Sequence, residues 1–238
     1  MNLNKICYKI FHIPGYGESH EKRSELFSSL DNFLSTKIDR LDTETILISN
    51  EEQYFDFNEK HGLIKTQREF KWGELGIWAS NLLAIKNFLN TDKEYLMLME
   101  DDIYVPDKVQ FIYLLEKYMG GLPEDWDVFS YFVHPDQLPR FNESKHLIND
   151  NTYIVKAYQD WSMLCYVLNR KSAQKMLDMT QESGLTMPID WYIYRQPEIF
   201  NSYTPHPLAE IGCKLYDIVS TFQTRETGHP VPEKRNNE

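Results

Sequence analysis

The chain has 238 residues, of which 42% are hydrophobic, and it carries three cysteines and a net charge of −11. A chain of this length buries enough surface to fold without disulfides or a structural metal. The negative charge disfavours proteins that bind nucleic acid by neutralising phosphates over a broad surface, and the apolar runs are too short for a membrane span. Because the sequence shows neither a secretory signal nor a disulfide framework, we expect a cytoplasmic protein.

Apolar periodicity predicts strands that alternate with helices along the chain. The expected strands cover residues 6–13, 45–49, 95–99, 127–133 and 163–168. The expected helices cover residues 19–34, 73–89, 107–118 and the segment from the Asn169 cap to residue 179. The least regular patterns lie in residues 135–151 and after residue 197.

This alternation is typical of an α/β fold, with a mixed or mostly parallel sheet flanked by helices. We expect a single domain over residues 1–226, followed by a polar tail over residues 227–238. In such folds ligands bind beyond the carboxyl ends of the strands. In the helix over 107–118, the residues expected to face inward are Val109, Ile112 and Leu115.

An acidic triplet, Glu100-Asp101-Asp102, follows the fully apolar strand at 95–99. Strand alternation would send Glu100 and Asp102 to one face and Asp101 to the other. Three adjacent carboxylates repel one another unless a positive charge lies between them, and carboxylate oxygens are ligands that suit Mn²⁺ or Mg²⁺. The alternative is a solvated strand end whose aspartates cap the next turn.

Five motifs occur in one order along the chain. They are Gly73-Glu74-Leu75-Gly76, the acidic triplet, Trp126-Asp127, the segment Tyr166 to Ala173, and Pro188-Ile189-Asp190. This succession resembles glycosyltransferase family 25, the lipooligosaccharide and collagen-type galactosyltransferase group, and the resemblance covers about residues 6–225. The chain departs from the family pattern at three positions, which are Ile77 for a cysteine, Asn81 for a histidine and Asn169 for a serine.

The resemblance implies a GT-A fold, a Rossmann-like α/β domain, and an inverting glycosyltransferase that takes a sugar from a UDP-sugar donor with the help of Mn²⁺ or Mg²⁺. By the family pattern, Asp102 is the first candidate for the metal ligand. Asp101 is assigned to the donor ribose or to the metal, and Glu100 to a supporting position on the donor side. A bound cation would stabilise the charge that grows on the departing diphosphate.

Asp190 is our candidate for the base that takes the proton of the acceptor hydroxyl, as inversion by direct displacement requires. Asp160, beside Trp161, is the second candidate. A helix cap is the structural alternative for Asp190. By the resemblance, a further metal ligand comes from the C-terminal region, where His229 ranks slightly ahead of His206.

Glu74 and Gly73 stand at a helix start, where backbone amides can receive anionic oxygens, and the resemblance gives them a role on the donor side. A capped helix with closely packed glycines is the alternative reading. The resemblance also places an arginine at the start of the first helix. Arg23 matches it and is expected to face uracil or phosphate, with an exposed surface arginine as the alternative.

The acceptor stays open between several chemistries. A glycan, as in lipopolysaccharide biosynthesis, is the first expectation. A hydroxymethylated DNA base, as in viral DNA glycosyltransferases, is the second, and it requires a local basic cleft. The residues that would form this cleft are Arg140, Lys145, Lys156, Arg170, Lys171 and Arg195. The third reading is a noncatalytic module that binds a nucleotide sugar or glycan, which the change at Asn81 favours.

Overall fold

The structure is a computed structural model of the whole chain, and it describes residues 2–17, 19–132, 145–149, 152–157, 163–206 and 213–214. The α-helices are α1 (His20–Leu34), α2 (Glu51–His61), α3 (Trp72–Leu89), α4 (Lys108–Gly120), α5 (Arg170–Ser183) and α6 (Ile189–Tyr194), and a short 3-10 helix covers Leu3–Lys5. The strands of the first half are β1 (Ile6–Phe11), β2 (Asp39–Arg40), β3 (Tyr95–Glu100) and β4 (Ile103–Tyr104). Those of the second half are β5 (Val128–Ser130), β6 (Lys145–Asn149), β7 (Thr152–Lys156), β8 (Cys165–Asn169), β9 (Ser202–His206) and β10 (Cys213–Lys214).

Eight of the described strands form one sheet in the order β2-β1-β3-β8-β5-β9-β7-β6. β1 pairs in parallel with β2 and β3, and β5 pairs in parallel with β9. The pairs that involve β7 or β8 are antiparallel. Six strands therefore point one way, and β7 and β8 point the other way. The prediction of a mixed, mostly parallel sheet flanked by helices is confirmed.

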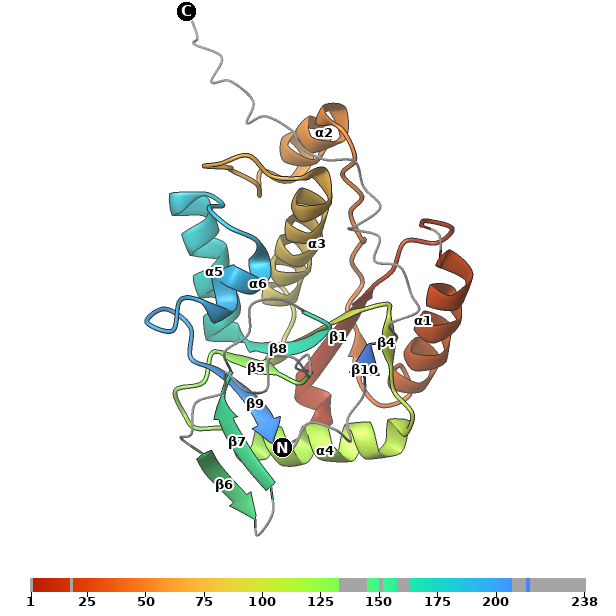
Figure 1. Cartoon of the computed structure of the whole chain (residues 1–238), viewed down its shortest axis with the longest axis vertical. Helices are drawn as coiled ribbons and strands as arrows, with labels where there is room; N and C mark the ends of the chain where they lie inside the picture. The colour runs from red at the N-terminus through yellow and green to blue at the C-terminus, as the bar shows by residue number, and fades with distance from the viewer. Residues whose placement is uncertain are drawn as a thin grey trace, which may run out of the picture.

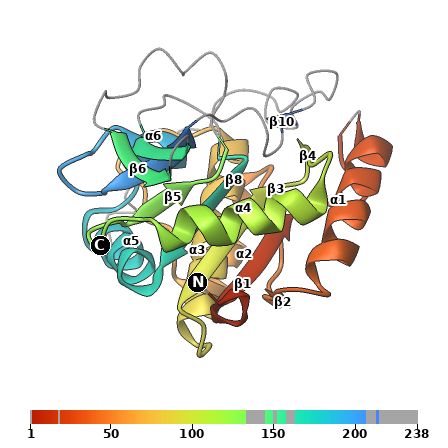
Figure 2. The same cartoon turned by 90° about the horizontal axis from the view of Figure 1, so that it is seen from below.

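The helices lie in two layers, one on each face of this sheet (Figure 1). The first hydrophobic cluster joins side chains of α2, α3, α5 and α6 to one face. The second joins side chains of α1 and α4 to the other face. Figure 2, seen from below, shows α4 running across the front of the molecule, before the strands of the sheet. The sheet is thus covered on both sides, which leaves its edges and strand ends as the places where a ligand can reach the backbone.

β3 is the central element of this packing. Its residues Leu96 to Met99 are all 0% exposed. Leu96 and Leu98 belong to the first cluster and Met97 and Met99 to the second, because successive side chains of a strand point to opposite faces. An unbroken apolar run is therefore required here, as the sequence indicated.

Local sequence signals account for several helix boundaries. Asn169 caps α5 through a 2.8 Å hydrogen bond that its side chain accepts from the Ser172 amide, as predicted. Asp107 caps α4 in the same way through the amide of Gln110. These short polar side chains satisfy amides that have no partner inside the helix.

Three of the predicted elements need correction. Val109 is 72% exposed and does not face inward, whereas Ile112 and Leu115 are buried as predicted, together with Phe111 and Leu114. No strand forms at 45–49. The second strand of the chain is β2, and the segment 41–49 leads from it to α2 without forming a strand. The segments read as irregular contain β6 within 135–151 and the described strands β9 and β10 after 197.

Candidate active site

The carboxyl ends of β1, β3 and β5 meet at one edge of the sheet, where β8 begins. The parallel register of β1 and β3 places Phe11 opposite Glu100. The next residue of each strand, His12 and Asp101, therefore leaves the sheet beside the other. Beyond this edge lies the acidic triplet.

The acidic triplet does not follow the alternation expected from the strand. β3 ends at Glu100, and Asp101 and Asp102 form a turn that leads into β4. Both aspartates contact the guanidinium of Arg23, so their carboxylates point to the same cation. The prediction that Asp101 and Asp102 lie on opposite faces is wrong, because the pleat that separates neighbours in a strand is absent in a turn.

Arg23 supplies positive charge between these two carboxylates. Its Nη1 donates a hydrogen bond to Asp101 Oδ1, and its Nη2 lies 3.4 Å from Asp102 Oδ2. Arg23, Asp101 and Asp102 are 6%, 8% and 2% exposed. Such a buried pairing offsets the desolvation of each charge. The structure thus places Arg23 in contact with carboxylates inside the protein, and its predicted contact with uracil or phosphate stays a prediction.

His12 is a member of this cluster that the sequence analysis missed. Its Nδ1 lies 2.8 Å from Asp101 Oδ2, and its Nε2 lies 3.2 Å from the hydroxyl of Ser24. Its ring stacks on Phe27 with centroids 4.5 Å apart. The signal that points to His12 is its position as the first residue beyond the carboxyl end of β1, at the edge where ligands bind in open α/β sheets.

The oxygen atoms of this cluster fit Mn²⁺ or Mg²⁺ in kind. Among the described residues, however, no group of three or more His, Cys, Asp or Glu side chains is arranged to hold an ion. Asp160, His229 and the side chain of His206 lie outside the described residues. β10 pairs with β4, the strand that directly follows Asp102, so part of the C-terminal region passes beside the acidic turn.

A second polar group lies at the same edge, inside the core. The Tyr166 hydroxyl donates to Asn81 Oδ1, and the Asn81 amide nitrogen donates to the Ile77 carbonyl at 2.8 Å. Burial, followed by the neighbouring Tyr194 and Glu100, raises the pKa of Tyr166 well above its ordinary value. Tyr166 therefore stays protonated and can donate. Asn81, which replaces the histidine of the family pattern, is 3% exposed and holds this buried tyrosine.

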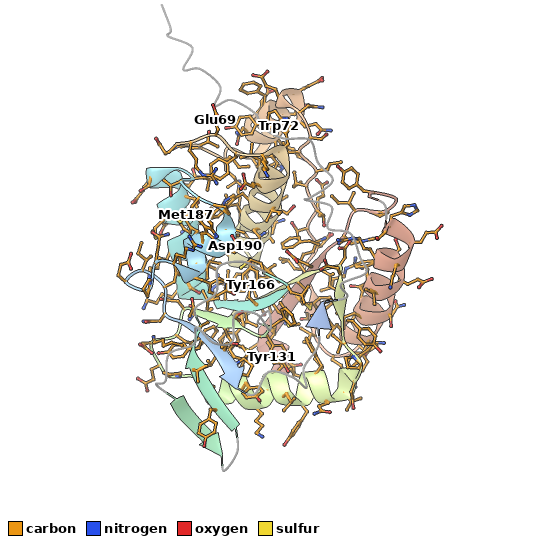
Figure 3. All side chains as sticks on the ribbon, in the orientation of Figure 1. Glu69, Trp72, Tyr131, Tyr166, Met187 and Asp190 are labelled. Carbon is orange, nitrogen blue, oxygen red and sulfur yellow. The ribbon has the colours of Figure 1, made fainter. Side chains whose placement is uncertain are left out.

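Asp190 stands in the first turn of α6, and one of its oxygens accepts the Trp191 amide at 2.9 Å. Two contacts fix α6 at the sheet edge. The Trp78 indole donates to the Met187 carbonyl at 3.0 Å, and the Tyr194 hydroxyl donates to Ser130 Oγ, at the carboxyl end of β5, at 2.8 Å. Asp190 and Tyr194 are four residues apart and share a helix face. Figure 3 labels Asp190 and Tyr166 near the middle of the molecule.

Glu74 caps the start of α3. Its Oε2 accepts the Lys71 amide at 2.8 Å, and its Oε1 lies 3.6 Å from Arg68. Gly73 is buried within the first turn. The last residue of α3, Leu89, lies near the start of β3. The first turn of α3, which carries Glu74, therefore lies toward the other end of β3, where the acidic triplet follows. The predicted donor-side role of Glu74 and Gly73 stays a prediction beside this capping role.

Other motif residues hold the elements together. Arg170 donates to backbone carbonyls at the end of α3, as at 2.7 Å to Leu89. Asp127 accepts the Asn201 amide at 3.0 Å and lies 3.4 Å from Lys175. These contacts give Asp127 and Arg170 structural roles in this chain.

The basic cleft required for a DNA acceptor loses two of its residues to internal contacts. The guanidinium of Arg170 is used by the end of α3, and Lys156 Nζ donates to Asn201 Oδ1 at 2.8 Å. Arg195 lies over the ring of Trp191, 3.7 Å from its centroid.

Within the described part of the chain, no helix combines the length and hydropathy needed to cross a membrane.

Comparisons with known proteins give the family of this chain. A structure of a mutant of Drosophila beta-1,4-galactosyltransferase 7, in complex with manganese, UDP-Gal and xylobiose, is similar with 10% identity and a TM-score of 0.45, over 97% of this chain and 78% of that one. A glycosyltransferase involved in glycosylation of the major capsid of PBCV-1 is similar with 11% identity and a TM-score of 0.41, over 84% and 80%. No curated protein matches significantly. The model of glycosyltransferase family 25 (LPS biosynthesis protein) matches residues 18–193, which is most of the chain and includes the acidic turn and Asp190. The protein therefore belongs to glycosyltransferase family 25 and is a transferase.

Proposed function

We propose that this protein transfers a sugar from a UDP-sugar donor to a hydroxyl group of a glycan, with inversion and with the help of Mn²⁺ or Mg²⁺. The observation that carries the proposal is the buried pair Asp101 and Asp102 at the carboxyl end of β3, inside the segment that matches the family. Ionised side chains are rarely buried unless a structural or chemical need retains them.

The residues of the chain divide the work between two sides of this edge. Asp102 would hold the metal ion, which would supply charge stabilisation to the departing diphosphate. Arg23 offsets the repulsion between Asp101 and Asp102, so that both stay close together at the strand end. Asp190 would take the proton of the acceptor hydroxyl as the sugar is transferred.

Asp190 has a suitable support for this role. It stands on α6, which the Trp78 and Tyr194 contacts hold against the sheet edge. A general base must be held within hydrogen-bond reach of the proton that it takes, and a helix fixed at both ends limits the movement of its side chains. The acceptor would then approach from the side of α6.

The test is incubation of the purified protein with Mn²⁺ and a panel of nucleotide sugars, with release of free nucleotide as the measurement. We expect turnover with one UDP-sugar and loss of turnover when the metal is chelated. In the presence of an acceptor, Asp190→Asn should lower kcat by about 100-fold or more. Asp178→Asn, at an exposed position of α5, is the matched control and should retain full activity.

Two results would contradict the proposal. One is the absence of nucleotide release across the whole panel from folded protein, which would favour a noncatalytic binding module. The other is an Asp190→Asn variant as active as the control, which would remove the assigned base while leaving the transferase assignment in place.

A further inference from the structure

The carboxylate of Asp101 is held by two other side chains of the cluster. Asp101 Oδ1 accepts from Arg23 Nη1, and Asp101 Oδ2 lies 2.8 Å from His12 Nδ1. Each of its oxygens is thus engaged with a buried side chain of the protein. The nearest approach of Arg23 to Asp102 is longer, at 3.4 Å, which lies beyond the usual range for such a hydrogen bond.

The partners of Asp101 are themselves fixed. His12 is held by stacking on Phe27 and by its contact with the Ser24 hydroxyl, 3.2 Å from Nε2. Ser24 and Phe27 belong to α1, the same helix that carries Arg23. β1, through His12, and α1, through Arg23, therefore meet at one carboxylate, and the side chains of both are 7% exposed.

We infer that Asp101 is a positioning residue and not a metal ligand: together with His12 it orients Arg23, and Arg23 in turn holds Asp102 at the sheet edge. The inference rests on the proposed function in one respect, that Asp102 is the carboxylate which would bind the metal. An ion that bound an oxygen of Asp101 would have to share that oxygen with Arg23 or His12, and the buried guanidinium beside it would repel the added positive charge. The two neighbouring aspartates of the motif therefore have different tasks.

The test measures Mn²⁺ affinity by electron paramagnetic resonance in the presence of UDP, without turnover, and thermal unfolding of the same variants without metal. Asp102→Asn should weaken Mn²⁺ binding by more than about 100-fold. Asp101→Asn should weaken it by only about 10-fold, as loss of an outer partner does. The order of the thermal effects should be the reverse, with Asp101→Asn lowering Tm by about 10 °C and Asp102→Asn by less.

His12 gives a second pair of variants that separates positioning from packing. His12→Asn keeps a nitrogen donor near the position of Nδ1, and His12→Leu keeps apolar contact with Phe27 but removes the donor. We expect Leu to weaken Mn²⁺ binding about 10-fold and Asn to restore it to within about 3-fold of the native value. A role in packing alone would favour Leu over Asn.

Several outcomes would overturn the inference. Loss of Mn²⁺ binding in Asp101→Asn as complete as in Asp102→Asn would make Asp101 a ligand. Native affinity in His12→Leu would remove the positioning role. Should the native protein bind no Mn²⁺, the metal requirement of the proposed function fails. The Tm values of the two Asp→Asn variants then test the structural role of Asp101. If Asp102→Asn lowers Tm more than Asp101→Asn does, that role is rejected.

Discussion

Two arginines of this protein occupy very different surroundings. Arg170 donates to backbone carbonyls after the last turns of α3, at 2.7 Å to Leu89 and 2.9 Å to both Thr91 and Lys93. Arg23 instead faces carboxylates. A cation that donates to backbone carbonyls stabilises the negative end of a helix, whereas carboxylates carry full charges that a ligand can also satisfy. Arg170 therefore helps to hold the fold together, whereas we propose that Arg23 maintains the site.

Replacing Arg23 should have the largest effect of the substitutions that test this comparison. Arg23→Met leaves Asp101 and Asp102 buried without the guanidinium between them, so we expect kcat/KM to fall by about 1,000-fold. Steady-state kinetics with the donor found in the nucleotide-sugar panel would measure this. Arg23→Lys keeps the charge but cannot bridge two carboxylates in the same way, and its activity should stay well below that of the native enzyme.

The matched substitution Arg170→Met should act on stability. Loss of charge-assisted hydrogen bonds to the end of α3 should lower the free energy of unfolding by about 3 kcal/mol, which corresponds to a Tm lower by about 10 °C. Activity per folded molecule, measured well below the unfolding transition, should change by less than about 2-fold because catalysis does not use this residue. A large loss of kcat with an unchanged Tm would reverse the distinction between the two arginines.

Glu74 offers the finest test, since capping and donor binding make different demands on its side chain. Glu74→Ala removes the acceptor of the Lys71 amide and should cost about 1 kcal/mol of stability. Glu74→Gln retains an acceptor oxygen and should keep most of the stability. If Glu74 also contacts the donor through its charge, Gln should raise the donor KM. A Gln variant with native Tm and native KM would leave capping as its role.

The sequence predicted those features that depend on neighbours along the chain. The run at 95–99 indicated a fully buried strand, Asn169 indicated a helix start, and the order of the motifs indicated the family. All three were confirmed, because burial and capping depend on residues close in sequence, and the order of the motifs can be read directly along the chain.

Features that depend on distant partners were not predictable in the same way. The contact of His12 with Asp101 joins residues 89 positions apart, and it follows from the register of β1 and β3, which no local pattern reports. The sequence also did not show that β3 ends in a turn, so it did not predict that the carboxylates of Asp101 and Asp102 both point toward Arg23. Val109 was misassigned because the buried stripe of α4 starts two residues later, at Phe111.

The position of β3 between β1 and β8 bears on how the protein is made. β3 is complete at residue 100, but its second neighbour ends only at Asn169. During synthesis the most apolar strand of the sheet therefore waits for about 70 further residues, several seconds at ordinary rates of translation, before both of its edges are paired. An exposed edge of this kind readily associates with other chains. Fragments that stop before β8 should accordingly aggregate. Shortened versions of the enzyme for expression should therefore retain β8.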